Sequence, residues 1–374
     1  MTTEHRAGYN IRRWLIVCGL AFTACALVLI SLQAGGQVQA AQHNVTVQSP
    51  PPQSSYLFRY NSVTHSFYTY TLPIGGLPYG LVVTGTNPTH VWVAESGSNK
   101  IGHLIYTDTT HYQFVEYPVT STTNSRPFQI AVDGNHVWFT ERGANRVGRL
   151  NAITGQIDEF YGNGLSPNSG LAEIKVASNG WVWIAGQQSD RLIRLVVTST
   201  YQFTEYSNAL LKGPFGITIE SSNDIWFTMP DAHGIGRFTP SDNLFVVPYN
   251  IPTNSSPIEL AVTPGFVWFS DLQNNSIDQI EIGTLSIVNP HGPIAAPYGL
   301  TTQSSTIFWT TQQNSMGAIG RMVYTSPISV SLDSYPLPTR GLVPTGIDVA
   351  ADNGVWAAAY APYRAYLPLV MKNH

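Results

Sequence analysis

The chain has little charge and no excess of positive charge. Only 11% of its 374 residues are charged, against roughly 25% in an average soluble domain. Its 18 basic residues are outnumbered by 22 acidic ones, so no cationic surplus is available to neutralise phosphates. Binding to nucleic acid and electrostatic attachment to an anionic membrane both depend on such a surplus. The composition therefore excludes a dedicated nucleic-acid binder.

Cysteine is almost absent as well. The two cysteines, Cys18 and Cys25, both lie within the first 40 residues. The rest of the chain therefore has no thiol with which to form a disulfide or a thiolate metal site.

The first 40 residues have the pattern of an export signal. Arg6, Arg12 and Arg13 precede an uncharged run at 14–32, and a small-residue region then ends at 38–40 with Val-Gln-Ala. This order is typical of a secretory signal peptide. An uncleaved membrane anchor is the alternative, because the apolar run is long for a signal. Either way, we expect the remainder to be secreted, extracellular or on the cell surface, with membrane contact only if the segment is uncleaved.

What the chain has in abundance is turn and strand residues arranged in a repeat. It contains 32 Gly and 25 Pro, and 11% of its residues are aromatic, a combination that favours strands joined by turns. An apolar residue followed by Trp recurs with a mean spacing of about 44 residues, at Trp92, Trp138, Trp183, Trp226, Trp268, Trp309 and Trp356. A period of 40 to 50 residues with strand composition is typical of propeller blades. We expect large tryptophans at this position to fill the core between blades.

Each period contains signals for four strands. A Pro-x-Gly-Ile start such as 214–217 precedes the Trp strand, an Ile-Gly-Arg-Phe strand such as 235–238 follows it, and an outer strand such as 203–206 closes a unit. The sequence therefore predicts an all-β, seven-bladed β-propeller of four-stranded antiparallel blades over residues 56–365.

The two ends of the repeat region predict how the ring closes. Residues 56–73 mirror 102–119, with Tyr60 aligned to Tyr106. The N-terminal strands would then be the outer pair of the last blade, and the C-terminal strands its inner pair, which leaves no open sheet edge. Residues 41–55, rich in Pro, Ser and Gln, suit a flexible linker. The tail at 366–374 is not needed to complete the ring. It would either compete for the place of the third strand of the last blade or pack outside the ring.

The repeated motifs carry a resemblance to a known family. VWVAES, VWFTER, IWFTMP and VWFSDL, together with NKIGHL, NRVGRL and HGIGRF, resemble the virginiamycin B lyase (streptogramin B lyase) family of seven-bladed propellers over residues 56–360. The resemblance implies a carbon–oxygen lyase that opens a cyclic depsipeptide antibiotic by elimination at its ester, with Mg²⁺, and hence antibiotic resistance. It also implies two His and two Glu on the top face of the last two blades.

Those four positions do not match here. Tyr298 and Thr345 stand in place of the two His, and Val343 and Tyr360 in place of the two Glu. None of them supplies a carboxylate for Mg²⁺ or a ready base at neutral pH. The resemblance therefore implies the fold, and it speaks against the family's chemistry by its usual residues.

Other side chains at the start of the innermost strands are candidates for a site. Four aromatic residues share one position there, and they either wedge between sheets as core or form a ligand floor at the axial entrance: Tyr79, Phe128, Phe215 and Tyr298. Glu173 and Glu259 stand one residue further on, at a position that is usually Gly. Two carboxylates near the axis could hold a metal ion or do acid–base work, or each could simply meet a backbone amide or water.

Two more sets of polar residues complete the candidates. His291, in the connection between blades five and six, is the best single candidate for a base. Glu95, Glu141 and Asp271 end their Trp strands at matching positions, and we expect them to be solvated face charges, with a ring of cation ligands as the alternative.

Three functions remain open from the sequence. The first is an exported propeller, expected to be monomeric, that binds a small molecule or peptide on its top face or acts as a platform without lyase chemistry. The second is a lyase of the resembled type with relocated groups at Glu173, Glu259 or His291. The third is a metal-dependent hydrolase or lactonase.

Overall fold

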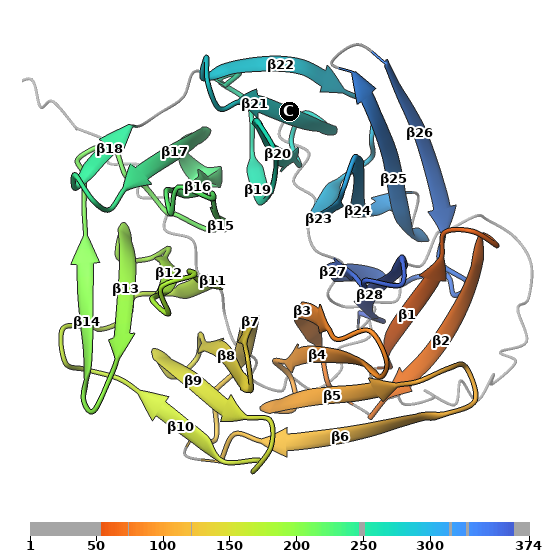
Figure 1. Ribbon diagram of the computed structural model, residues 1–374, viewed down its shortest axis with the longest axis horizontal. Helices are drawn as coiled ribbons and strands as arrows, with labels where there is room; N and C mark the ends of the chain where they lie inside the picture. The colour runs from red at the N-terminus through yellow and green to blue at the C-terminus, as the bar shows by residue number, and fades with distance from the viewer. Residues whose placement is uncertain are drawn as a thin grey trace, which may run out of the picture. The chain divides into compact units, whose positions relative to one another are not determined.

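The computed structural model describes residues 54–362, apart from 74, 121, 247–250, 314–315 and 327–328. These residues belong to one compact unit, in which seven four-stranded antiparallel sheets are arranged as a ring (Figure 1). The predicted seven-bladed propeller is therefore confirmed. The signal or anchor at 1–40 with Cys18 and Cys25, most of the linker and the tail at 366–374 lie outside the described residues, and the expectations about them stay predictions.

The two inner strands of each sheet surround the axis (Figure 1). The innermost strands are β3 (Pro78–Thr84), β7 (Pro127–Asp133), β11 (Leu171–Val176), β15 (Ile217–Ile219), β19 (Pro257–Thr263), β23 (Pro297–Gln303) and β27 (Val343–Val349). The second strands, which carry the tryptophans, are β4 (Thr89–Glu95), β8 (His136–Glu141), β12 (Val182–Gly186), β16 (Ile225–Met229), β20 (Phe266–Asp271), β24 (Thr306–Gln313) and β28 (Gly354–Tyr360).

The two outer strands of each sheet form the rim. The third strands are β5 (Lys100–Tyr106), β9 (Arg146–Asn151), β13 (Arg191–Val197), β17 (Gly234–Thr239), β21 (Ser276–Glu281), β25 (Met316–Ser326) and β1 (Ser55–Asn61). The outermost are β6 (Tyr112–Pro118), β10 (Ile157–Phe160), β14 (Tyr201–Tyr206), β18 (Leu244–Val246), β22 (Ser286–His291), β26 (Ser329–Pro336) and β2 (Ser66–Leu72). A short 3₁₀ helix, η1 (Pro230–Ala232), follows β16. Within the described part of the chain, no helix is long and apolar enough to span a membrane.

The ring closes as predicted. The seventh sheet has the order β2-β1-β28-β27, and β1 pairs antiparallel with β28 from Ser55 opposite Tyr360 to Asn61 opposite Gly354. Both ends of the repeat region thus share one sheet, and the inner C-terminal strands leave no free edge toward the rim.

The core lies between neighbouring sheets. All seven repeated tryptophans are buried, and Trp226, Trp268 and Trp356 have no exposed surface, which confirms their predicted packing role. The Gly of the Ile-Gly-Arg type strand makes room for the aromatic residue opposite it. A Cβ on Gly148 would lie 2.0 Å from the Phe139 ring, so this glycine is required by packing.

A β-bulge near the start of the innermost strand positions the site. Six of the seven sheets have a register shift there, for example between Pro78 and Leu81. Bulges re-aim side chains and are frequent beside functional sites. Where the second bulge residue is Gly, the next blade comes very close, because a Cβ on Gly299 would lie 2.6 Å from the carbonyl oxygen of Thr345. Gln129, Glu173 and Glu259 take this place in three blades.

Candidate ligand-binding site at the propeller axis

The axis of the propeller contains a small polar cavity. Its volume is about 50 Å³, and its lining includes Gln129, Glu173, Lys175 and Glu259. A cavity needs only about 10–15 Å³ to hold one water molecule, so this one has room for a few waters. The structure therefore brings together Glu173 and Glu259, the two carboxylates that the sequence placed near the axis.

Hydrogen bonds join these polar groups across three blades. The Lys175 Nζ donates to Glu173 Oε1 at 2.8 Å within β11. The Gln129 Nε2 on β7 donates to Glu259 Oε1 on β19 at 3.2 Å. Glu173 and Glu259 are 3% and 8% exposed, so both carboxyl groups are withdrawn from bulk water and are partnered instead by protein.

The surroundings shift the pKa values of Glu259 and Lys175. Burial, and then the neighbouring Glu173 carboxylate, raises the pKa of Glu259 well above its ordinary value. Burial acts to lower the pKa of Lys175, but the charges of Glu173 and Glu259 outweigh it, and the pKa is raised. The site therefore pairs the Lys175 ammonium with Glu173, beside a second acid, Glu259, whose neutral form is favoured by burial.

The residues at the axis do not fit a magnesium ion. Mg²⁺ requires near-octahedral coordination, largely by oxygen ligands, whereas here one carboxylate binds the Lys175 ammonium and the other accepts from the Gln129 amide. Among the described residues, no group of three or more His, Cys, Asp or Glu side chains is placed to hold a metal. The ammonium of Lys175 already supplies the positive charge that a metal ion would bring.

Aromatic rings form a contact layer beside this cavity. Tyr79, which also lines the cavity, lies 4.9 Å from Phe128 between ring centroids, and Phe128 lies 6.1 Å from Phe215. The ring of Tyr360 is 6.2 Å from Tyr79. Phe128 is buried, while Tyr79 and Phe215 are half-buried. The layer thus both packs as core and presents apolar surface at the start of the innermost strands.

A guanidinium group covers part of this aromatic layer. The Arg142 Cζ lies 4.9 Å from the centroid of the Phe128 ring, and Arg142 Nη2 donates to Gln187 Oε1 at 2.5 Å. Burial lowers the pKa of Arg142, while Tyr298 acts to raise it. Burial and the charge of Glu259 raise the pKa of the Tyr298 phenol, so Tyr298 is a neutral hydrogen-bonding group at neutral pH.

Sequence reasoning missed Lys175, Gln129 and Arg142. Two of them left a readable signal. Lys175 follows Glu173 by two residues and so shares its face of the strand, and Gln129 occupies the same repeat position as the two glutamates. Arg142 follows the end of β8 in a turn, where the direction of its side chain depends on local backbone geometry.

The four positions that carry His and Glu in the resembled family have other tasks here. The Thr345 hydroxyl lies 2.9 Å from the carbonyl oxygen of Pro78 and 3.3 Å from that of Ala358, so it links β27 to β3. Val343 pairs with Tyr360 at the ends of β27 and β28. Tyr298 lines the axial cavity. None of the four supplies a carboxylate or an imidazole.

His291 lies apart from the axial carboxylates. It ends β22, the outermost strand of its sheet, rather than lying in the following connection. The residue is 7% exposed, its ring centroid lies 5.9 Å from that of Trp268 in a stacked arrangement, and burial lowers its pKa. Glu173 and Glu259 are on innermost strands, so the structure does not bring this histidine to them.

The acids that end three Trp strands were expected to be solvated charges on one face, and this expectation is wrong. Glu95, Glu141 and Asp271 have no exposed surface. Glu95 accepts from Ser98 Oγ and Glu141 from Ser125 Oγ, each at 2.9 Å. Burial raises the pKa of Glu95 to about 8 and that of Glu141 to about 7. These carboxyl groups hold neighbouring turns in place and do not form an exposed ring.

Comparisons with known proteins agree with the fold and the motifs. The Virginiamycin B lyase family matches residues 155–364. A virginiamycin B lyase from Nocardia farcinica (strain IFM 10152) is 24% identical over 179 residues, which cover 38% of this chain and 62% of that protein. The chain thus spans less than two thirds of that relative.

Solved structures give the same result. A streptogramin B lyase superimposes with a TM-score of 0.66 at 25% identity, covering 82% of this chain and 98% of that one. A virginiamycin B lyase from Staphylococcus aureus gives 0.62 at 25% identity, covering 75% and 94%. With the family match extending over more than half of its length, the chain belongs to the virginiamycin B lyase family.

Proposed function

We propose that this exported propeller binds a small molecule or peptide with aromatic or apolar surface at its axial entrance. The observation that carries the proposal is the layer of contacting rings at Tyr79, Phe128 and Phe215, with the Arg142 guanidinium against it. Ligand sites typically combine aromatic walls with a few convergent polar groups. Export is supported by the basic and apolar pattern of residues 1–40.

Binding without the family's usual chemistry is favoured by the replaced positions. The Thr345 hydroxyl donates its hydrogen bond to a backbone carbonyl oxygen, and burial raises the pKa of Tyr360. Neither side chain therefore accepts a proton at neutral pH. General base catalysis needs a group whose pKa lies near the working pH. The ligand would therefore be held at the axis and released unchanged.

Quinupristin is a suitable first probe. A catalytically inactive virginiamycin B lyase from Staphylococcus aureus has been solved with quinupristin; at 23% identity this likeness shows the fold alone. We expect saturable binding of quinupristin to this protein by calorimetry, weakened about tenfold in Tyr79→Ala because aromatic anchors dominate such contacts. Tyr112→Ala, which removes an exposed ring from β6, is the matched control. Absence of binding, or equal binding by Tyr79→Ala and the control, would contradict the proposal.

A lyase with relocated groups is the second candidate. Two carboxyl groups in different surroundings are typical of acid–base pairs. Glu173 is paired with the Lys175 ammonium, whereas burial raises the pKa of Glu259. In an ester elimination, a base removes a proton from the carbon beside the C–O carbon, a C=C bond forms and a carboxylate leaves. The ring would open with no change in mass, which fragmentation and chromatography detect, and Glu173→Gln would abolish the product.

A metal-dependent hydrolase or lactonase is the third candidate. Hydrolysis would add one water to the mass of the opened ring. If the two axial carboxylates held a metal, EDTA would lower the melting temperature, and the double variant Glu173→Gln with Glu259→Gln would lose that response. Because Lys175 already neutralises the site, we expect a melt that does not respond to EDTA.

A further inference from the structure

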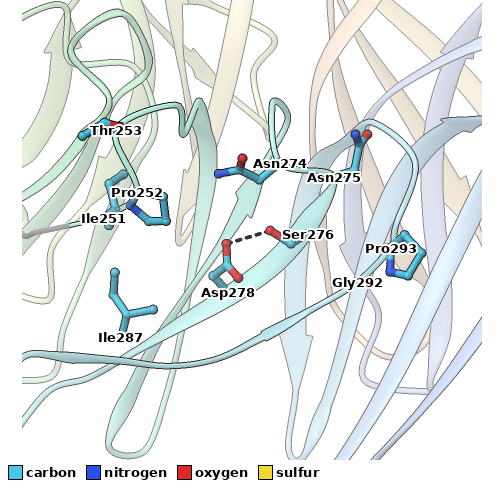
Figure 2. Close-up of a pocket in the computed structure, with 10 residues that line it drawn as sticks. All are labelled: Ile251, Pro252, Thr253, Asn274, Asn275, Ser276, Asp278, Ile287, Gly292 and Pro293. Atoms are coloured by element: carbon cyan, nitrogen blue, oxygen red, sulfur yellow. Dashed lines mark hydrogen bonds between the residues drawn. The ribbon is translucent and has the colours of Figure 1, made fainter.

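A second and larger cavity lies in the fifth blade, away from the axis (Figure 2). Its volume is about 790 Å³, within the 300–1,000 Å³ typical of small-molecule sites. It is lined by the third and fourth strands, β21 and β22, by the turn before β21, and by the connections on either side of the sheet. None of the innermost-strand residues that line the axial cavity takes part. We call this cavity the blade-5 pocket.

One buried carboxyl group faces the blade-5 pocket. Asp278 on β21 lines it and is only 5% exposed. Figure 2 shows Asp278 between the walls formed by Ile251 and Pro293, with Ser276 beside it. Asp278 Oδ2 accepts from Ser276 Oγ at 2.8 Å, whereas Asp278 Oδ1 has no hydrogen-bond partner among the described residues. A buried carboxylate oxygen without a partner is costly, so its retention calls for an explanation.

Asp278 also breaks the internal repeat. It pairs with Phe269, just as Gly148 pairs with Phe139 and Gly236 with Phe227. Four other blades have Gly at this position of the third strand, and the other two have Ile193 and Phe58. The ladder between β21 and β22 shifts register at Asp278, and such bulges re-aim side chains. Departures from a local rule are expected at functional sites.

Among the described residues, no basic group compensates this carboxylate. No ion pair with a described Lys, Arg or His involves Asp278, and the nearby charge of Asp271 is of the same sign. Burial raises the pKa of Asp278 to about 6, so the group is ionised at pH 7.5. The pocket thus offers one unpaired negative charge among apolar walls.

We propose that the blade-5 pocket binds a small organic amine, whose ammonium group pairs with Asp278 Oδ1 while its apolar body packs against Ile251, Ile287 and Pro293. A charge-assisted hydrogen bond to a buried carboxylate is among the stronger polar contacts in proteins. The pocket volume sets the size of the ligand, and the single carboxylate sets its charge. The site is independent of the axial one, because it shares no lining residue with it.

The test compares a charged probe with its neutral counterpart on the full chain at pH 7.5. Ligand-observed NMR or calorimetry would measure 2-phenylethylamine against 2-phenylethanol, which have similar shapes. We expect the amine to bind at least tenfold more tightly than the alcohol. Asp278→Asn should remove that preference. Asp242→Asn, which deletes an exposed acid in the hairpin between β17 and β18, should preserve it.

Two further variants keep the outcome decisive. Asp278→Gly restores the residue that most blades have, so it is expected to fold and to lose the amine preference. Tyr79→Ala alters the axial entrance alone and should leave amine binding unchanged. Equal binding of amine and alcohol, an amine preference that survives in Asp278→Asn, or loss of amine binding in Tyr79→Ala would each overturn the proposal. None of these results depends on whether quinupristin binds at the axis.

Discussion

At the scale of single residues, one repeat position distinguishes this chain. The repeat position that in most blades follows an aromatic residue near the start of the innermost strand is Gly in four blades, where the next blade's backbone leaves no room for a Cβ. Gln129, Glu173 and Glu259 occupy this position in the other three blades, and their side chains meet at the axis. Lys175 adds the balancing charge. The axial site therefore consists of residues that depart locally from a regular repeat. The Lys175 ammonium and the Gln129 amide allow two buried carboxyl groups to lie close together.

The two axial glutamates should differ in their effect on stability. Glu173→Gln leaves the Lys175 ammonium without its carboxylate. Because the Lys175 side chain is 38% exposed, water moderates the loss, and we expect a decrease of about 1–3 kcal/mol in the free energy of unfolding. Glu259→Gln replaces an acid whose neutral form is favoured by burial with a neutral isostere, and it should cost less than about 1 kcal/mol. Urea unfolding measures both variants; equal losses would contradict the different roles of the two carboxyl groups.

Burial of Glu141 predicts a dependence of stability on pH. In the folded state the pKa of Glu141 is about 7, against an ordinary value of 4.5. The protonated carboxyl group therefore contributes its full stabilisation below pH 4.5. The free energy of unfolding falls by on the order of 3 kcal/mol as pH rises through 7. Unfolding free energies at pH 5 and pH 8 should differ less in Glu141→Gln than in the wild type. An identical pH slope in both proteins would count against this origin.

At the scale of elements, the third strand and the Trp strand pack through a glycine. Gly148 lies under the Phe139 ring, and an added Cβ would be 2.0 Å from it. In blade five, Asp278 replaces this glycine, and a pocket lies beside β21. The same structural position thus serves packing in most blades and offers a polar group in one.

This packing gives a direct test by substitution. Gly148→Ala forces the ring or the strand to move and should cost about 1–3 kcal/mol. Gly283→Ala is the matched control, because a Cβ there has no heavy atom within 4 Å. Thermal or urea unfolding of both variants measures the difference. Equal stability of Gly148→Ala and the wild type would show that the contact is not as tight as described.

The strands could be predicted from the sequence because the same strand pattern recurs in seven repeats. The tryptophan spacing and the mirror between 56–73 and 102–119 led to the correct blades and ring closure. The site was only partly predictable, since the convergence of Glu173 and Glu259 follows from their shared position. The place of His291 depends on the register of β22 beside a bulge, and hydropathy does not encode such a register. The burial of Glu141 depends on Ser125, which approaches from a preceding connection.

At the scale of the whole molecule, the ring depends on its two ends meeting. β1 and β28 pair over seven residues each, and Arg59 on β1 forms an ion pair with Asp352 at 2.7 Å. An innermost site needs this closure, because the strands that line the cavity come from blades spread around the ring. Binding at the axis and integrity of the ring are therefore coupled.

Removal of the N-terminal strands should break that coupling. A chain that begins after Leu72 lacks β1 and β2 and exposes the edge of β28. Exposed edges favour association with other chains, so we expect aggregation and a lower melting temperature by size-exclusion chromatography and calorimetry. A chain that begins at Ser54 should remain a monomer with the wild-type melt. A stable monomer without β1 and β2 would contradict the proposed role of the closure.

The central claim is that this member of the family binds at its axis without opening its ligand. The most direct measurement is incubation of the protein with quinupristin, with and without Mg²⁺, followed by chromatography and fragmentation mass spectrometry beside a binding titration. We predict saturable binding, weakened in Tyr79→Ala, with the ring intact in both conditions. A ring-opened product of unchanged mass that disappears in Glu173→Gln would contradict the claim.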